Sequence, residues 1–158
     1  MAKLSAGVLL FRRANHGIEV FLVHPGGPFW AKKDNGAWSL PKGEYVEGDE
    51  PLAAARREFE EETGIGVDGD FVSLGQVRQR GGKVVTAWAL ERDLDPGALK
   101  SNTFPLEWPP GSGRVQEFPE VDRGAWFSLP EARVKLLKGQ VPFIDRLERV
   151  AGDTVPAG

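Results

Sequence analysis

Residues 41–65 read PKGEYVEGDEPLAAARREFEEETGI, and the second half of this stretch carries the clearest helix signal in the chain. An acidic residue stands at its start, Pro51 falls in the first turn, a run of alanines follows, and Gly64 stands where a helix would stop. Proline in the first turn and glycine just past the end are typical helix boundaries. The stretch therefore predicts a helix over residues 49–63.

Four glutamates, Glu58, Glu60, Glu61 and Glu62, lie near the end of this predicted helix. Negative charge is disfavoured there because the helix dipole places partial negative charge at the C-terminus. Glu58 and Glu62 also form a like-charged pair four residues apart, which costs helix stability. A helix that accepts both penalties is typical of a site that stores negative charge for a cation.

A helical wheel separates these glutamates into two groups. With Glu58 at zero and about 100° per residue, Glu62 falls near 40° and Glu61 near 300°, so the three share a sector of roughly 100°. They lie along the border of the apolar face that includes Phe59. Glu60 falls on the solvent-facing side. Grouped carboxylates need a counter-charge, and oxygen ligands without His or Cys nearby suit Mg²⁺ or Mn²⁺.

A plainer alternative is a solvated helix with surface Arg–Glu pairs. This alternative explains Glu60, which is expected to pair with Arg56, and Glu61, which lies four residues from Arg57. It does not explain why two further carboxylates lie four residues apart on the same side of the helix. The grouping therefore favours a cation site.

The spacing of these residues resembles the Nudix box. The box runs glycine, five residues, glutamate, seven residues, Arg-Glu, an apolar residue, any residue, Glu-Glu, any residue, glycine and an apolar residue. One position departs, because Asp49 stands where the family usually has glutamate, and Asp keeps the charge with a shorter reach. The matching residues are Gly43, Arg57, Glu58, Phe59, Glu61, Glu62, Gly64 and Ile65.

This resemblance implies a hydrolase that breaks a pyrophosphate bond in a nucleoside diphosphate linked to a further group. It implies a small-molecule nucleotide substrate and a Mg²⁺ cofactor, with Mn²⁺ as the alternative. Two other readings stay open: a non-catalytic nucleotide-binding or regulatory module on the same fold, and a structural domain whose acidic helix is surface decoration. Degenerate modules typically lose box glutamates, and this chain keeps them, which favours the enzyme.

Residue roles follow from position in the box. The resemblance implies Glu58, Glu61 and Glu62 as metal ligands. Arg57 is expected to orient Glu61 rather than to touch substrate. Gly43 is expected to let the backbone approach the site and to shape the entry from loop to helix. The general base is left open between Glu58 and a glutamate outside the box.

A further ligand or base in such proteins often comes from a loop just before a late tryptophan-containing strand. The corresponding stretch is QEFPEVDRGAW, residues 116–126. Glu120, six residues before Trp126, is predicted as that catalytic residue and as a fourth metal ligand. Glu117 is the second candidate. An exposed loop acid is the alternative reading for either glutamate.

Aromatic and basic residues outside the box are candidates for substrate binding. Trp30 stands in a predicted loop with Lys32 and Lys33, a combination that could hold a base and a phosphate. A loop anchor is the alternative reading for Trp30. Lys42, next to the box glycine, and Lys83 are predicted to meet substrate phosphates.

The substrate class can be narrowed only in part. Residues 36–43, GAWSLPKG, are similar to the diadenosine polyphosphate hydrolase branch of the family. Many members of that branch carry a tyrosine downstream of the box, and Tyr45 is the only tyrosine in this chain. The expectation therefore stops at a nucleoside polyphosphate or a dinucleoside polyphosphate.

Length and composition indicate one globular domain. The chain has 158 residues, of which 41% are hydrophobic and 27% charged. We expect a single domain over residues 1–152 and a frayed tail over residues 153–158. The formal net charge of -3 implies no broad basic surface, so duplex nucleic acid is not an expected partner. The absence of cysteine excludes disulfides and thiolate metal sites.

The apolar run over residues 4–11 is predicted to be a buried strand rather than a signal peptide. It is short and meets Arg12 and Arg13 without a small-residue cleavage site. No stretch of the chain is long enough to span a bilayer, so no membrane contact is expected. A cytoplasmic location is the simplest expectation, and the oligomeric state is not readable.

The remaining pattern mixes strands with few helices. It predicts an α+β fold with a mixed β-sheet layered between helices. Strands are expected at residues 6–12, 19–23, 71–79 and 83–90, with shorter ones at 38–40, 103–108 and 126–129. Loops are expected at residues 25–37 and 41–48, and further helices at residues 130–138 and 142–150.

Overall fold

The structure is a computed structural model that describes residues 3–152; the tail expected at residues 153–158 lies outside the described residues. The strands are β1 (Leu4–Ala14), β2 (Gly17–Pro25), β3 (Lys42–Tyr45), β4 (Val72–Arg78), β5 (Val84–Glu91), β6 (Thr103–Glu107), β7 (Val115–Pro119) and β8 (Val121–Ser128). The α-helices are α1 (Pro51–Thr63), α2 (Leu129–Lys135) and α3 (Pro142–Ala151), with short 3₁₀ helices η1 (Pro96–Ala98) and η2 (Lys138–Gln140).

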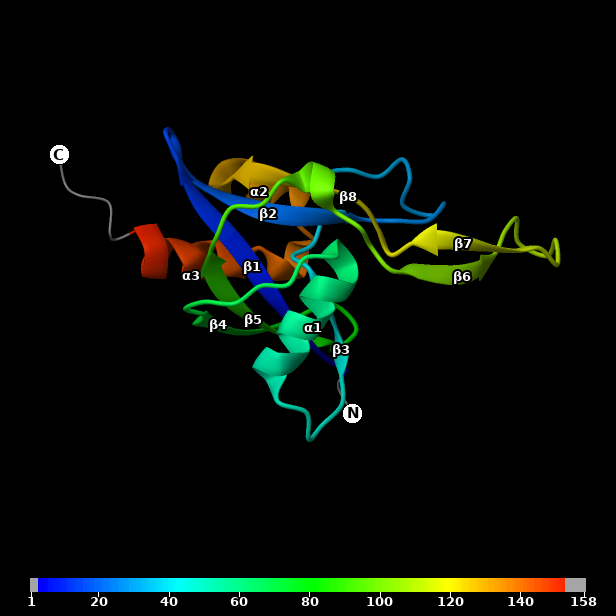
Figure 1. Ribbon diagram of the computed structural model, residues 1–158, viewed down its shortest axis with the longest axis horizontal. Coiled ribbons are helices and arrows are strands. Elements are labelled where there is room, and N and C mark those ends of the chain that lie inside the picture. The colour runs from blue at the N-terminus through cyan, green and yellow to red at the C-terminus, as the bar shows by residue number, and fades with distance from the viewer. Residues whose placement is uncertain (1–2, 153–158) are drawn as a thin grey trace.

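A six-stranded mixed sheet forms the centre of the molecule (Figure 1). Its order is β4-β5-β1-β2-β8, with β3 as an additional partner of β1. β1 runs parallel to β5 and antiparallel to β2 and β3. β6 and β7 form a separate hairpin that projects from the body (Figure 1). The predicted α+β fold with a mixed sheet is confirmed.

The sheet has one hydrophobic core on each face because successive side chains of a strand point to opposite sides. Val8 and Leu10 of β1 pack with Ala55 and Phe59 of α1. Leu9 points to the other face, where it packs with α2 and α3. The sheet is therefore layered between helices, and α1 has a single buried side that fixes its orientation.

Helix α1 begins slightly later than the sequence predicts and ends where predicted. The Glu50 side chain caps it by accepting hydrogen bonds from the backbone N–H groups of Leu52 (3.3 Å) and Ala53 (2.7 Å). Gly64 closes the helix in the left-handed conformation, with φ of 76°. Glycine takes that conformation without the steric cost that a side chain brings.

The predictions for the other two α-helices are confirmed with small shifts in their ends. Ser128 caps α2 as expected, and it forms a reciprocal capping box with Glu131. α2 ends at Lys135, three residues before the predicted end, and α3 covers the predicted segment. None of the helices within residues 3–152 is long and apolar enough to cross a membrane.

Two predicted loops are wrong. Residues 41–48 contain the four-residue strand β3, and residues 116–126 contain most of β7 and β8. β3 escaped prediction because its strand character comes from pairing with β1 rather than from its own apolar pattern. β7 pairs only with β6, and its residues are mostly exposed, so it has no buried side to create an alternating pattern.

The two ends of β1 have different partners on the same edge. The first part pairs with β3, from Leu4 opposite Tyr45 to Gly7 opposite Lys42. The last part pairs with β2. Gly7 lies where the partners change, and a Cβ there would lie 2.5 Å from the carbonyl oxygen of Pro41. This close approach brings β3 against β1 and beside α1.

Candidate active site

A cavity of about 560 Å³ opens beside β3 and the C-terminal half of α1. Seven of the nine site residues predicted from the sequence line it: Trp30, Lys42, Gly43, Glu58, Glu62, Lys83 and Glu120. Arg57 and Glu61 are not among its lining residues. Segments far apart in the chain therefore meet at one cavity, which combines acidic, basic and aromatic groups.

Gly43 allows β3 to pass directly against Glu58. A Cβ on Gly43 would occupy the position of the Glu58 carboxylate group. Any larger residue would have to displace that carboxylate from its present position. The structure thus gives the glycine of the box motif a packing reason: it sets the distance between β3 and α1.

Glu62 is held by the backbone of β3. Its carboxylate accepts a hydrogen bond from the backbone N–H of Lys42 at 3.1 Å. Burial is the main cause that raises the pKa of Glu62; the hydrogen bond and the charge of Lys42 lower it, the charges of Glu120 and Glu58 raise it, and the resulting pKa is about 8. The repulsion between Glu58 and Glu62 that the sequence predicts therefore operates in the fold.

Glu58 and Glu120 show the same electrostatic pattern. Burial and then the neighbouring Glu61 carboxylate raise the pKa of Glu58, while Arg57 lowers it. Burial and then Glu61 raise the pKa of Glu120 as well. Glu61 thus acts on both residues although it does not line the cavity. We call Glu58, Glu61, Glu62 and Glu120 the acidic group; the basic side chains nearby do not balance the charge of its four carboxylates.

The main chain of Asn102 places Glu120 beside the acidic helix. Its N–H donates to the carbonyl oxygen of Glu61 (2.9 Å), and its carbonyl accepts from the N–H of Glu120 (2.8 Å). The carbonyl of Glu120 in turn accepts from Gly26 (2.9 Å). Glu120 is exposed at the rim of the cavity but anchored on both sides. Glu117 lies on β7, paired with Pro105, and does not line the cavity.

Lys42 and Lys83 supply positive charge in the same cavity. Burial and then the nearby charge of Lys83 lower the pKa of Lys42, while Glu62, Glu44 and Glu58 raise it. Two ammonium groups that repel one another form a site that favours a bound anion. The cavity therefore offers both cation-attracting and anion-attracting groups.

The donor set fits a hard divalent cation. Carboxylate oxygens are the ligands that Mg²⁺ and Mn²⁺ prefer. Within residues 3–152, no three His, Asp or Glu side chains come close enough to form a complete metal cage. Mg²⁺ commonly binds through one or two carboxylates while it keeps waters and takes phosphate oxygens. Glu58, Glu61, Glu62 and Glu120 could hold such an ion in that open manner.

The expected contact between Arg57 and Glu61 is wrong. The Nε atom of Arg57 lies 3.3 Å from Oε2 of Glu58, the next residue in the chain, and this is the only ion pair of Arg57 in the described part of the chain. Arg57 therefore orients Glu58. The helical wheel gives the neighbours of a residue along a helix, but the rotamer of a long side chain depends on the surrounding structure.

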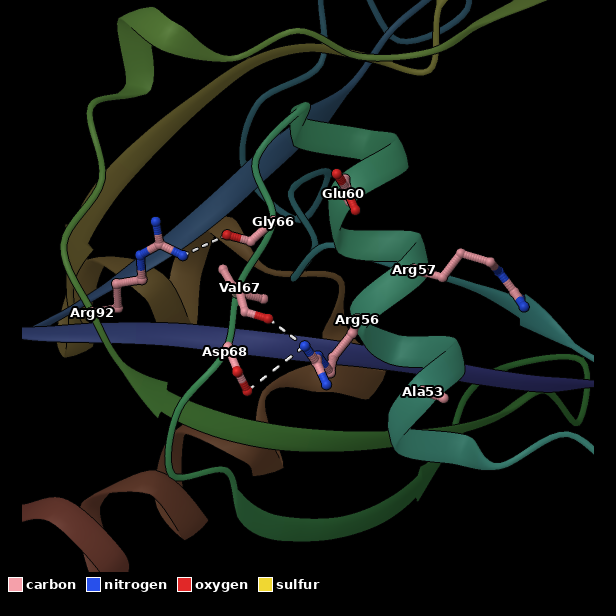
Figure 2. Close-up of a pocket in the computed structure, with 8 residues that line it drawn as sticks. All are labelled: Ala53, Arg56, Arg57, Glu60, Gly66, Val67, Asp68 and Arg92. Atoms are coloured by element: carbon pink, nitrogen blue, oxygen red, sulfur yellow. Dashed lines mark hydrogen bonds and ion pairs between the residues drawn. The ribbon is translucent and has the colours of Figure 1, made fainter.

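The expected pair between Arg56 and Glu60 is also wrong. Figure 2 shows Arg56 directed at the segment after α1, where it donates to the carbonyl of Val67 (3.1 Å) and lies 3.7 Å from Asp68. Glu60 has no ion pair among residues 3–152. The returning segment offers a carbonyl oxygen and a carboxylate that the sequence pattern of the helix alone does not reveal.

A second cavity of about 510 Å³ lies on the outer side of α1, away from the acidic group (Figure 2). Three arginines line it, but two of them hold the segment after the helix. Arg56 donates to Val67, and Arg92 donates to the carbonyl of Gly66 at 2.6 Å. Arg57 points away from both (Figure 2). Their contacts explain these arginines as structural groups.

Two residues of importance to the site were missed by sequence reasoning. Phe104 of β6 lines the cavity, although only a short strand was expected at its position. The other is His24, which is fully buried. Its Nδ1 lies 3.0 Å from Oδ1 of Asp122, and its Nε2 lies 2.6 Å from the carbonyl oxygen of Lys33. His24 thereby connects two parts of the chain: β8 and the loop that contains Trp30.

Comparison with known proteins agrees with this arrangement. The NUDIX domain model matches residues 1–147. The chain belongs to the Nudix family. It is a Nudix-type pyrophosphohydrolase by that membership, and the resemblance of its box to the family is confirmed. A search of curated protein sequences gave no match.

Solved Nudix structures share the fold at low sequence identity. An Ap4A hydrolase from C. elegans in a binary complex has a TM-score of 0.63 and 20% identity, covering 96% of this chain and 99% of that one. The NUDIX domain of Shewanella oneidensis NrtR, complexed with ADP ribose, has a TM-score of 0.65 and 18% identity. The match covers 96% of this chain and 90% of that one. A mutT/nudix family protein from Listeria innocua has a TM-score of 0.58 and 17% identity, and the match covers 96% of this chain and 94% of that one.

Proposed function

We propose that this Nudix protein hydrolyses a pyrophosphate bond in a nucleoside polyphosphate or dinucleoside polyphosphate, with Mg²⁺ or Mn²⁺ as cofactor. The observation that carries the proposal is the placement of acidic and basic groups in one cavity. Glu58, Glu62 and Glu120 line it together with Lys42 and Lys83. A diphosphate carries several negative charges, so it needs both a cation and nearby ammonium groups in order to bind.

The acidic group is the proposed metal site. A bound divalent ion would neutralise phosphate charge and lower the pKa of a bound water. Glu58, Glu61, Glu62 and Glu120 would hold it, and the hydrogen bond from the Lys42 backbone fixes the orientation of Glu62. Arg57 holds the Glu58 carboxylate in place.

Lys42 and Lys83, which line the same cavity, would bind the phosphate oxygens. The general base is left between two carboxylates: Glu58, which is held by Arg57, and Glu120, which stands at the exposed rim. A base must reach the proton of the attacking water, and both residues line the cavity where that water would stand.

The nucleotide class rests on two further points. Trp30 lines the cavity and could provide a flat face for a base. Among proteins of similar fold, one is an Ap4A hydrolase and another was solved with ADP ribose. Both names contain an adenine nucleotide joined through phosphates, which agrees with the chemistry of this cavity.

The test is a panel of nucleoside and dinucleoside polyphosphates with Mg²⁺ or Mn²⁺, with products identified by mass and the position of the broken bond determined in ¹⁸O-labelled water. We expect incorporation of one labelled oxygen into a phosphate product. Binding without turnover would support instead a regulatory module. Hydrolysis that is unchanged in excess EDTA would contradict the metal site.

Charge-neutral variants provide the matched comparison. Glu62→Gln should lower kcat by about a hundredfold or more, because it removes a ligand of the ion that stabilises transferring charge. Glu60→Gln is the control, because Glu60 lies on the same helix and outside the cavity. Equal loss of activity in both variants would contradict the assignment of the acidic group.

A further inference from the structure

A smaller cavity of about 180 Å³ adjoins the wide one. The two cavities share Pro25, Trp30, Lys42, Glu62 and Glu120. The smaller one has five wall residues of its own, and we call it the inner lobe: Val23, Ala37, Ser39, Val121 and Leu137. Any ligand group in the inner lobe would therefore lie next to the proposed metal and phosphate positions.

The side chains of the inner lobe offer no free polar group. Four of the five are aliphatic, and Val23, Ala37 and Val121 are buried. The fifth is Ser39, whose hydroxyl donates to the carbonyl of Leu40 at 2.6 Å and accepts from the amide of Gln140 at 3.0 Å. A hydroxyl has only one hydrogen to donate, so Ser39 has no donor left for a ligand.

The backbone donors of the inner lobe are occupied as well. All five wall residues use their N–H groups within the protein. Val23 donates to Ser39 (2.8 Å), Ser39 to Val23 (3.0 Å), Ala37 to Asp34 (2.9 Å), Leu137 to Trp38 (2.8 Å) and Val121 to the hydroxyl of Ser101 (2.9 Å). A ligand in the lobe therefore meets an apolar surface without directed N–H groups.

The size of the inner lobe matches one ring system. An apolar cavity of about 150 Å³ in another protein binds benzene, and the inner lobe has about 180 Å³. Trp30 stands where the two cavities meet, and the Lys33 ammonium lies 5.4 Å from the centre of its ring. That contact stabilises the indole in place, so a planar group that enters the lobe passes an aromatic surface.

We propose that the inner lobe binds the nucleobase of the substrate by shape and apolar contact, with little selectivity among bases. This inference rests on the proposed function, because it places the diphosphate in the adjoining wide cavity. Without free donors in the wall, the lobe cannot donate hydrogen bonds to the acceptor atoms on the edge of a base. An apolar pocket separates related ligands by only about 10- to 200-fold, whereas a pocket with matched hydrogen bonds reaches about 10⁴-fold.

The first test fills the lobe. In Ala37→Leu the larger side chain would extend into it, and Ala53→Leu makes the same change on the exposed outer side of α1. Binding of ADP and of methylenediphosphonate, which has no base, is measured by calorimetry with Mg²⁺. We expect Ala37→Leu to weaken ADP binding by about tenfold or more, while methylenediphosphonate binding stays within about twofold in both variants.

An equal effect of Ala37→Leu on the two ligands, or no effect on either, would overturn the proposal. Because this variant could fail to fold, Leu137→Ala provides a second test by enlarging the lobe. It should improve the binding of N6-benzyl-ADP relative to ADP. A ratio equal to that of the unchanged protein would count against the lobe as the base site.

The second test measures base selectivity. Adenosine, guanosine, cytidine and uridine compounds with the same phosphate chain should differ in affinity by no more than about 200-fold, the most that an apolar pocket supplies, and a larger preference would overturn the proposal. The binding measurements do not require turnover. If Ala37→Leu weakens the binding of ADP but not of methylenediphosphonate, and no hydrolysis is found, the proposed function fails alone. If hydrolysis is found and Ala37→Leu has no effect on ADP binding, only the inner-lobe proposal fails.

Discussion

At the scale of single residues, the position of Gly43 shows how closely the backbone and the acidic group are packed. Replacing Gly43 with alanine would place a methyl group where the Glu58 carboxylate lies. We expect a loss of about 1–3 kcal/mol in the free energy of unfolding from overpacking. Displacement of Glu58 should also weaken metal binding. Thermal melting and Mn²⁺ calorimetry measure the two effects.

Gly66→Ala is the matched control for that change. A Cβ at Gly66 would meet only the Glu60 side chain, at an ordinary contact distance of 3.7 Å. We expect it to change the melting temperature and metal affinity little. A Gly43→Ala protein with unchanged stability and metal affinity would show that β3 can move away from Glu58 at no cost.

The raised pKa of Glu62 predicts how stability depends on pH when metal is removed. This pKa is about 8 in the fold against an ordinary value of 4.5, so the folded state holds the proton more tightly than the unfolded state. The stabilisation is fully present below about pH 4.5 and is lost as the pH rises through about 8. The melting temperature in EDTA should therefore fall by several degrees across that range.

Glu62→Gln should flatten this dependence, because an amide does not titrate. Differential scanning calorimetry in EDTA at a series of pH values compares the two proteins. The raised pKa values of Glu58 and Glu120 act in the same direction and leave a residual slope. A melting temperature that rises with pH in both proteins would contradict the burial of these carboxylates.

The residues of the acidic group could be predicted from the sequence because helix geometry fixes their mutual spacing. Glu58 and Glu62 lie on one side of α1 for that reason, and both line the cavity. The partners of the arginines could not be predicted. Arg56 contacts Val67, which the chain brings to the helix only after a turn at Gly64.

At the scale of elements, the buried His24 connects the Trp30 loop to β8. Both of its ring nitrogens face acceptors, the Asp122 carboxylate and the Lys33 carbonyl. His24 thus holds the position of the loop relative to the strand that follows Glu120.

We predict that His24→Gln raises KM with a smaller effect on kcat, because it releases the substrate-binding loop and leaves the acidic helix unchanged. Loss of a buried hydrogen bond should also cost about 1–3 kcal/mol in stability. Steady-state kinetics and melting curves measure both, with His16→Gln in the exposed turn as the control. A fall in kcat with unchanged KM would contradict the positioning role of His24.

The elements that could be predicted are those with a pattern of their own. β1 has alternate residues on two buried faces, and α1 has caps and an apolar side. β3 and β7 could not be predicted, because their pairing depends on β1 and β6 and not on local sequence. The same limit explains why residues 116–126 were expected to form a loop, although only Glu120, at the bend between β7 and β8, lies outside a strand there.

At the scale of the whole molecule, the proposed metal site and folding stability are linked. An ion that binds the folded chain but not the unfolded chain raises the free energy of unfolding, by about 2.7 kcal/mol when its concentration is a hundred times Kd. We predict a melting temperature several degrees higher in millimolar Mg²⁺ or Mn²⁺ than in EDTA. An equal concentration of K⁺ controls for ionic strength.

The double variant Glu58→Gln, Glu62→Gln separates this effect from general screening. It should be at least as stable as the unchanged protein in EDTA, since repulsion is removed, and it should gain little from Mg²⁺. A metal-dependent rise of equal size in both proteins would place the bound ion elsewhere.

The parallel pairing of β1 with β5 has a consequence for how the protein reaches this state. Leu4 pairs with Val84, and the register continues to Phe11 opposite Glu91, so the partners lie about eighty residues apart in the chain. A hairpin closes in about 1–10 μs, whereas pairing over long separations is much slower. The cavity draws on segments from both sides of this pairing, from Trp30 to Glu120. A newly made chain therefore gains its ligand-binding capacity late, together with the complete sheet, and exposes unpaired strand edges until then.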